Sequence, residues 1–234
     1  MEAKDRIIVA LDNMDETQAI DLAEKLEGLI WGFKINDLFV SAGPEIIYEL
    51  YPFGEVFLDL KFHDIPATVA NHAKKVSAIR GLKIFNVHAL GGLEMMKEAV
   101  KNKGNCEAFA VTILTSMLNE DCQRLYGMGV VRKVLQLTRE AKEAGVDGII
   151  CSAQELEFLN KKEDLKDLKK ITPGIRPLWA AKLDQKRVAT PAGAIEAGAY
   201  KLVIGRPITR PPPEIGNPVE ATRRIIEEIE KLLK

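Results

Sequence analysis

The sequence contains few cysteines, no excess of either charge and no long hydrophobic run. Its 234 residues include three cysteines, Cys106, Cys122 and Cys151, an odd number without the spacing of a metal site. A disulfide framework is therefore not expected, and a reducing cytoplasm suits the chain. Lys and Arg number 33 against 34 Asp and Glu, so the net charge of −1 argues against non-specific binding to nucleic acid or to a membrane surface. No apolar stretch approaches the roughly 20 residues of a membrane span, and the N-terminal run is too short for a signal peptide.

Two glycine-rich nucleotide motifs are also missing. No G-x-G-x-x-G follows the first apolar run and no P-loop is present, which argues against an open sheet that binds a nucleotide cofactor. The chain is 47% hydrophobic and 29% charged, a composition that allows a packed core and excludes wholesale disorder. Because there is no linker, repeat or low-complexity tract, we expect residues 1–234 to form a single domain.

Short β-branched runs alternate with amphipathic stretches along the whole chain. The runs are apolar at consecutive positions, which is typical of strands buried on both faces of a parallel sheet. We predict strands at 6–11, 31–35, 55–60, 83–88, 108–114, 147–151, 169–173 and 201–205. Helices fill the gaps: the first is expected to begin after Asp15 and to stop at Gly28, and the last to begin after Asn217 with Pro218 in its first turn. Eight strand–helix units predict an α/β fold of the (β/α)8, or TIM, barrel type; a doubly wound open sheet is the alternative.

In such a barrel, active sites lie at the C-terminal ends of the strands, so polar residues there are the candidates. Asp59 and Lys61 end the third strand two residues apart, and alternation predicts that both point toward the barrel interior. Lys34 on the second strand and Asp12 after the first can join them. Burying these charges is costly unless they pair, so the group is either a structural ion pair or a catalytic array, and its size favours catalysis.

A metal site is the competing interpretation of the same region. His63 and His88, with Asp59 and Asp64, are possible ligands. Lys61 falls between the two carboxylates, however, and its ammonium group would repel a divalent cation. We therefore expect no metal and take His63 to be a packing residue or one that supports the site residues from behind.

The ends of the last two strands suggest a phosphate site. Gly174 and Gly205 permit close approach of the backbone to a ligand, and Arg176 and Arg206 supply bidentate donors. Loops after strands seven and eight of a barrel frequently bind phosphate.

Longer strings at these positions carry a resemblance to a known family. They are FLDLKFHDIPATV (57–69), VTILTSM (111–117), TPGIRP (172–177), DQKRVATP (184–191) and VIGRPIT (203–209). With Lys34 upstream, the chain resembles orotidine 5′-monophosphate decarboxylase of the bacterial type along nearly its whole length. The resemblance implies a barrel enzyme of de novo pyrimidine biosynthesis, free of cofactor and metal, that converts orotidine monophosphate to uridine monophosphate and CO2.

The resemblance also implies a homodimer with the active site shared across its interface. One subunit would supply Lys34, Asp59 and Lys61, and the other Asp64, Ile65 and Thr68. Asp12 and Lys34 would hold the ribose, and Thr115 and Ser116 would lie beside the pyrimidine. The phosphate would be held by Gln185, Arg206 and the Gly205 backbone, with Arg176 nearby.

Lys61 is the expected centre of the chemistry, as the ammonium group that stabilises the C6 carbanion and then protonates it. The segment 177–188 is the expected lid. Two places depart from the family pattern: Asn36-Asp37 follow Lys34 where a glycine is common, and three prolines occupy 211–213. Two alternatives remain: a Mg2+-dependent sugar-phosphate aldolase or decarboxylase on the same scaffold, and a non-catalytic barrel that binds a phosphorylated ligand.

Overall fold

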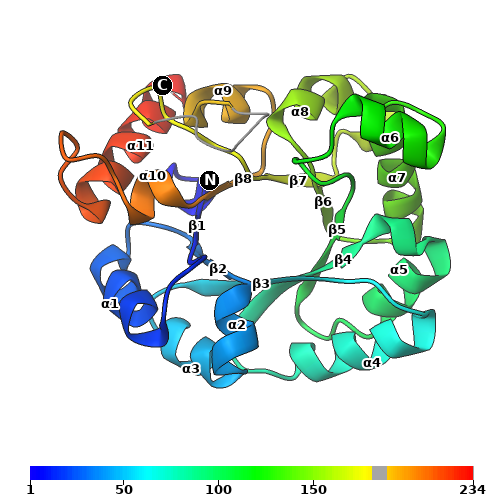
Figure 1. The fold of residues 1–234 in the computed structure, drawn as a ribbon, viewed down its shortest axis with the longest axis horizontal. Coiled ribbons are helices and arrows are strands. Elements are labelled where there is room, and N and C mark those ends of the chain that lie inside the picture. The colour runs from blue at the N-terminus through cyan, green and yellow to red at the C-terminus, as the bar shows by residue number, and fades with distance from the viewer. Residues whose placement is uncertain (181–188, 234) are drawn as a thin grey trace.

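Eight parallel strands close into a barrel in the computed structural model, which describes residues 1–180 and 189–233. The strands are β1 (Ile7–Ala10), β2 (Gly32–Ile35), β3 (Glu55–Phe62), β4 (Leu82–His88), β5 (Glu107–Val111), β6 (Gly148–Ile150), β7 (Lys169–Thr172) and β8 (Lys201–Ile204). Each strand pairs with its neighbours in chain order, and β1 pairs with β8 to close the ring (Figure 1). The predicted TIM barrel is confirmed, and the alternative prediction of a doubly wound open sheet is wrong.

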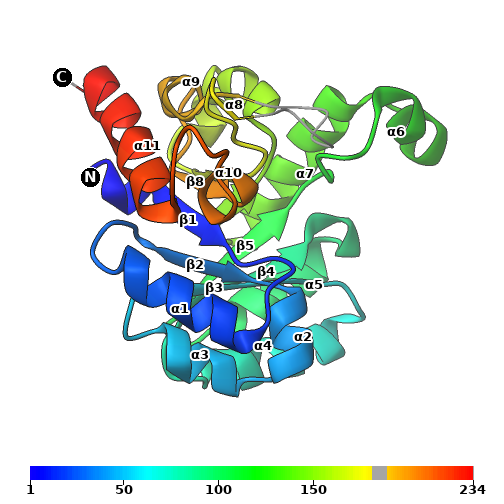
Figure 2. The same ribbon diagram turned by 60° about the vertical axis from the view of Figure 1, so that its left-hand side comes forward.

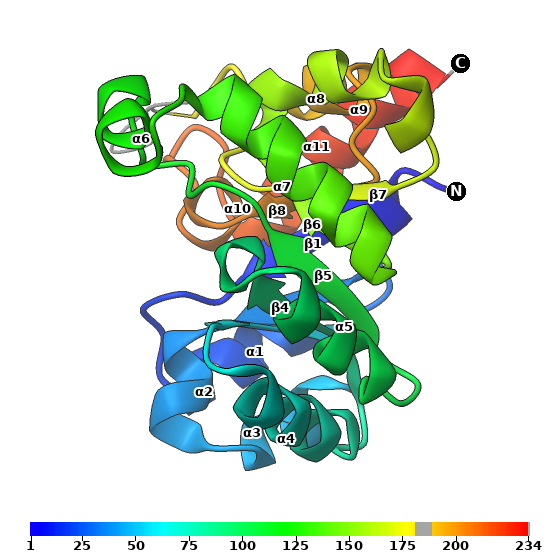
Figure 3. The same cartoon turned by 90° about the vertical axis from the view of Figure 1, so that its right-hand side faces the viewer.

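Helices surround the barrel on the outside (Figures 1 and 2). They are α1 (Glu16–Leu26), α2 (Asp37–Ala42), α3 (Glu45–Leu50), α4 (Pro66–Ser77), α5 (Leu93–Lys101), α6 (Asn119–Tyr126), α7 (Val130–Ala144), α8 (Ala153–Asn160), α9 (Pro191–Glu196), α10 (Arg206–Thr209) and α11 (Pro218–Leu233). Short 3-10 turns lie at Lys4–Arg6, Ala89–Gly91 and Glu163–Leu165. Helix α6 projects from the ring formed by the others (Figure 3).

The core has two parts, as the fold requires. A large cluster fills the space between the strands and the helices, and a smaller one fills the barrel interior. The interior cluster consists of Ile8, Ala10, Phe57, Ile84, Phe109, Ile171 and Val203. Gly148 makes room for it, because a Cβ atom there would lie 2.3 Å from the ring of Phe109. The barrel is thus packed below its mouth, and a ligand can enter only at an end.

The predicted strand ends agree with the structure to within three residues. The largest difference is in β5, which was expected to reach residue 114 and stops at Val111. Its neighbour β6 is only three residues long and pairs with Phe109–Val111. The Thr112 N–H donates to the carbonyl of Ile150, the last residue of β6, at 3.2 Å, and the residues after Thr112 have no further β6 residue to pair with. They form a loop at the barrel mouth instead.

The helix boundaries follow the predicted caps. Asp15 and Gln18 form a reciprocal capping box at the start of α1, with the Asp15 carboxylate accepting from the Gln18 N–H at 2.8 Å. The Asn217 side chain accepts from the Glu220 N–H at 3.0 Å before α11. Among the described residues, no helix combines the length and the apolarity that crossing a membrane would require.

Candidate active site

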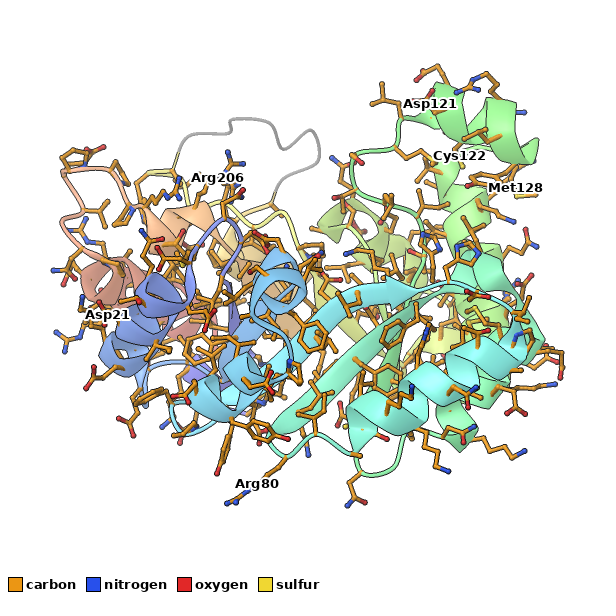
Figure 4. The ribbon with its side chains drawn as sticks, turned by 60° about the horizontal axis from the view of Figure 1, so that its bottom comes forward. Asp21, Arg80, Asp121, Cys122, Met128 and Arg206 are labelled. Atoms are coloured by element: carbon orange, nitrogen blue, oxygen red, sulfur yellow. The ribbon has the colours of Figure 1, made fainter. Side chains whose placement is uncertain are left out.

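A cavity of about 670 Å3 opens where the strands end at their C-terminal side. Its lining includes residues that follow β1, β5, β7 and β8 and residues within β2 and β3: Asp12, Lys34, Asp59, Lys61, Thr115, Gly174, Arg176, Gly205 and Arg206. Figure 4 shows Arg206 and α6, which carries Asp121 and Cys122, toward one end of the molecule and Arg80, which precedes β4, at the other. The lining of this cavity thus contains most of the predicted site residues.

Four side chains on one wall of the cavity form an alternating series of charges. The ammonium group of Lys34 lies 2.8 Å from Asp12 Oδ1 and 3.2 Å from Asp59 Oδ2. The second oxygen of Asp59, Oδ1, lies 2.7 Å from Lys61 Nζ. The order Asp12–Lys34–Asp59–Lys61 places an opposite charge on each side of the two central residues, which is the arrangement that makes buried charge tolerable.

Lys34 is the most deeply buried member of this series, with 7% of its surface exposed. Burial on its own would lower the pKa of Lys34, but the negative charges of Asp59 and Asp12 outweigh it and raise the pKa above the ordinary value. Lys34 is therefore a permanent cation at neutral pH, suited to holding a polar ligand and Asp59 in place.

Lys61 reaches Asp59 by a different route from the predicted one. Its φ angle is +52°, in the left-handed region, and the pairing of β3 with β4 shifts register between Leu58 and Phe62. The simple alternation that predicted a shared side of the strand does not hold through this bulge. The two side chains meet because the backbone bends at Lys61, and the Lys61 side chain, 31% exposed, lies on the cavity.

A second, smaller cavity of about 90 Å3 adjoins the first beside Lys61. It shares Lys34, Asp59, Lys61, Thr115, Pro173 and Val203 with the larger cavity, and its other walls are mainly apolar: Phe57, Val111, Ile113, Leu114, Ile150 and Cys151. A flat ring with one charged edge fits such a space. Ser116, predicted beside Thr115, is exposed and lines neither cavity.

The large cavity is also lined by the predicted anion-binding residues that follow β7 and β8. Gly205 and Arg206, at the start of α10, line it together with Gly174 and Arg176. Arg176 is buried, and its Nη1 donates to the Ile175 carbonyl at 3.1 Å. Gln185 and residues 181–188 of the expected lid lie outside the described residues. The two ends of that segment meet, since the Arg176 N–H donates to the Ala189 carbonyl at 2.9 Å.

Asp64, Ile65 and Thr68 do not line the cavity of their own chain. Asp64 and Ile65 are exposed just before α4, and Ile65 exposes 66% of its surface. The Asp64 carboxylate accepts from the Ile65 N–H at 2.6 Å and makes no ion pair within the part of the chain that the structure describes.

The two histidines considered as metal ligands stack on each other instead, with ring centroids 5.5 Å apart. Burial, together with the nearby His63 and Lys61, lowers the pKa of His88 to about 4, so His88 is neutral at pH 7. Across residues 1–180 and 189–233, no three His, Cys, Asp or Glu side chains gather as a metal ion would require.

Reasoning from the sequence missed Asn86. It is fully buried on β4, two residues after the interior-facing Ile84, and it hydrogen bonds to both Asp59 and Lys61. A polar residue at an inward position of a strand was the signal that could have identified it.

The loop after β1 contains a second group of residues that the sequence did not predict. Asn13, at φ +58°, donates its N–H to Asp37 at 2.8 Å and accepts at its carbonyl from Arg210 at 3.2 Å. Asp37 and the residue before the three prolines thus brace the loop that carries Asp12. One departure from the family pattern, Asp37, therefore contacts this loop directly, and Arg210, which contacts it as well, immediately precedes the other.

The barrel and the charged cavity at the C-terminal ends of its strands define an enzyme of the (β/α)8-barrel class. Comparison with known proteins narrows the class. Residues 5–225 match the orotidine 5′-phosphate decarboxylase / HUMPS family. The chain belongs to this family.

Individual relatives agree over nearly full length. An orotidine 5′-phosphate decarboxylase of Syntrophomonas wolfei is 42% identical, with 99% of this chain and 100% of that protein covered. The protein of the same name from Nitrosococcus oceani is 45% identical over 97% of this chain and 98% of its own length. A crystal structure of orotidine 5′-phosphate decarboxylase from Lactobacillus acidophilus superimposes with a TM-score of 0.80 at 34% identity, covering 96% of this chain and 99% of the other.

Proposed function

We propose that this protein decarboxylates orotidine 5′-monophosphate to uridine 5′-monophosphate and CO2 in pyrimidine biosynthesis. The observation that carries the proposal is the series Asp12–Lys34–Asp59–Lys61, which ends with an ammonium group on the cavity. Family membership and the full-length relatives named orotidine 5′-phosphate decarboxylase support it.

Loss of CO2 from C6 of the pyrimidine leaves an electron pair in the plane of the ring, where the π system cannot delocalise it. In the proposed mechanism Lys61 faces C6, and its positive charge stabilises that pair as the carbon–carbon bond breaks. Opposite charges about 4 Å apart attract by roughly 4 kcal/mol at an effective dielectric of about 20. Lys61 then transfers a proton from Nζ to C6, and the neutral amine regains a proton from solvent.

Asp59 has two roles in this mechanism. It holds Lys61 by the 2.7 Å contact, and it stands beside the carboxylate that leaves. Crowding of two negative charges raises the energy of the bound substrate and is relieved as neutral CO2 forms. Lys34, paired with the other oxygen of Asp59, keeps the carboxylate oriented.

The rest of the nucleotide occupies the remainder of the large cavity. Asp12 and Lys34 hydrogen bond to the ribose hydroxyls, and Thr115 lies at the pyrimidine. Gly205 and Arg206 hold the phosphate, with Arg176 behind them. Binding of the phosphate, remote from C6, provides free energy that orders the ring against Lys61.

A second copy of the chain completes the site in this proposal. Asp64, Ile65 and Thr68 of one subunit extend over the cavity of the other, so that Asp64 meets the free side of Lys61. Asp64 and Ile65 are exposed and do not line the large cavity of their own chain, so both are accessible to a second copy, which supports this arrangement. A cytoplasmic location is proposed as well, and it is consistent with three buried cysteines that are not joined in disulfides.

The test is an assay of the purified protein with orotidine 5′-monophosphate, following the change in absorbance and the release of CO2, with and without EDTA. We expect turnover that EDTA leaves unchanged. Turnover abolished by EDTA and restored by Mg2+ would favour the metal-dependent alternative, and binding of uridine monophosphate without any turnover would favour a ligand-binding barrel.

A further inference from the structure

Asn86 on β4 contacts both ends of the charged pair that the proposed reaction needs. Its side-chain amide donates from Nδ2 to Asp59 Oδ1 at 2.6 Å, and its Oδ1 accepts the backbone N–H of Lys61 at 2.7 Å. The side chain is fully buried and lines neither cavity, so a ligand does not reach it. Only one orientation of the amide satisfies both partners, because the carboxylate needs a donor and the N–H needs an acceptor.

The bond to the Lys61 backbone occurs where that backbone is strained. Lys61 is one of two non-glycine residues with positive φ in the described part of the chain, and a side chain at such an angle costs about 1–2 kcal/mol. The register shift between β3 and β4 occurs at the same place and takes Lys61 out of the regular strand ladder. Its N–H therefore bonds to a side chain, and that side chain is Asn86.

We infer that Asn86 is a positioning residue for decarboxylation, which holds Lys61 in its left-handed conformation and fixes the Asp59 carboxylate against it. The inference rests on the proposed function. Asn86 acts through Lys61 and Asp59, touches no reacting atom, and sets the place of the ammonium group at the cavity. A displacement of about 1 Å in such a group lowers turnover by about a hundredfold.

Two substitutions at this position test the inference. Asn86→Ala removes both hydrogen bonds, and we expect kcat to fall about a hundredfold while the affinity for uridine monophosphate stays within threefold. Asn86→Asp is isosteric: its protonated carboxyl group can donate to Asp59 and accept from Lys61, whereas its ionised form repels Asp59. Burial and the neighbouring carboxylate raise the pKa of such a group, so we expect kcat of Asn86→Asp, relative to wild type, to increase as the pH falls from about 8 to 5.

Asn160→Ala is the matched control, because Asn160 donates to the Ala197 carbonyl at 2.6 Å, far from the cavity, between α8 and α9. It should leave kcat unchanged. The inference is overturned if kcat of Asn86→Ala stays within threefold of this control, if kcat and nucleotide affinity fall together, or if Asn86→Asp shows no recovery in acid. If Asn86→Ala does not fold, the pH profile of Asn86→Asp decides alone.

A crystal structure of the Asn86 variants separates this inference from the proposed function. Should the wild-type protein fail to decarboxylate the nucleotide, the proposed function is lost, but the geometric inference is still tested. A Lys61 φ angle outside the left-handed region in a variant supports the holding role of Asn86. An unchanged Lys61 backbone and an intact contact with Asp59 reject it.

Discussion

The ammonium group of Lys61 lies 2.7 Å from Oδ1 of Asp59, although the backbone between them departs from regular strand geometry. In an ideal strand, the side chains of residues i and i+2 lie on the same face and point in the same direction, so they do not turn toward each other. The positive φ angle at Lys61 turns its side chain back onto Asp59 and leaves the ammonium group on the cavity. The strained residue is thus the one to which the proposed mechanism assigns the chemistry, as is common for backbone strain at active sites.

Replacement of Lys61 by alanine should remove turnover and preserve the fold. We expect kcat to fall by at least about a thousandfold, because one charge contact of about 4 kcal/mol and the proton donor are lost together. Enzyme assays combined with circular dichroism measure both outcomes, and Lys25→Ala, on the exposed face of α1, is the control. Turnover of Lys61→Ala close to wild type would remove Lys61 from its proposed role.

Replacement of Arg206 by alanine should act mainly on binding. A hydrogen bond to a charged group contributes about 1.5–3 kcal/mol, which corresponds to a KM about 10- to 100-fold higher. Steady-state kinetics and titration with inorganic phosphate measure the change, and Arg223→Ala on α11 is an exposed arginine for comparison. An unchanged KM would contradict the phosphate assignment.

Much of the fold could be predicted from the sequence because a parallel barrel buries its strands on both faces. Continuous apolar runs such as Ile7–Ala10 and residues 202–204 stand out against the polar faces of the helices. Caps at Asp15 and Asn217 fixed the starts of α1 and α11. Strand ends were less predictable, since the end of β5 depends on the length of β6 and not on its own residues.

The site was predictable where residues sit at strand ends and less so where the backbone is irregular. Lys34 and Asp59 follow from strand position alone. The bulge at Lys61 and its bond to Asn86 do not, because both depend on the register between β3 and β4. The hydrogen bond from the Asn13 N–H to Asp37, the first residue of α2, joins residues 24 positions apart, which no local pattern predicts.

Mixing two inactive variants tests the shared site. In the proposed dimer, Lys61→Ala lacks the ammonium group of one subunit and Asp64→Ala lacks the carboxylate contributed by the other, so each variant alone should be nearly inactive. After mixing and exchange, half of the dimers are mixed and each has one intact site, so about a quarter of wild-type activity should return.

Two controls accompany the mixing experiment. The wild-type protein should sediment as a dimer, and a mixture of Lys61→Ala with Lys61→Ala,Asp64→Ala should stay inactive. If the two single variants exchange subunits and regain no activity, the site belongs to one chain.

Lys201 at the N-terminal end of β8 gives a prediction about pH and stability. Only 3% of the surface of Lys201 is exposed, and its ammonium group lies over the rings of Trp31 and Tyr200 and donates to the Asp5 carbonyl. Burial lowers the pKa of Lys201 to about 8, against about 10.5 in an unfolded chain.

This difference in pKa makes stability depend on pH. Below pH 8, Lys201 is charged in both states, and the buried charge destabilises the folded protein. Between pH 8 and 10.5, the folded form releases the proton while the unfolded form keeps it. The contribution of Lys201 to the free energy of unfolding should therefore rise with pH, by about 1–2 kcal/mol between pH 7.5 and 9.5. Urea unfolding at the two pH values measures this, with Lys201→Met expected to lose the rise and Lys25→Met, an exposed lysine, expected to keep it. A rise of equal size in Lys201→Met would assign the effect to other groups.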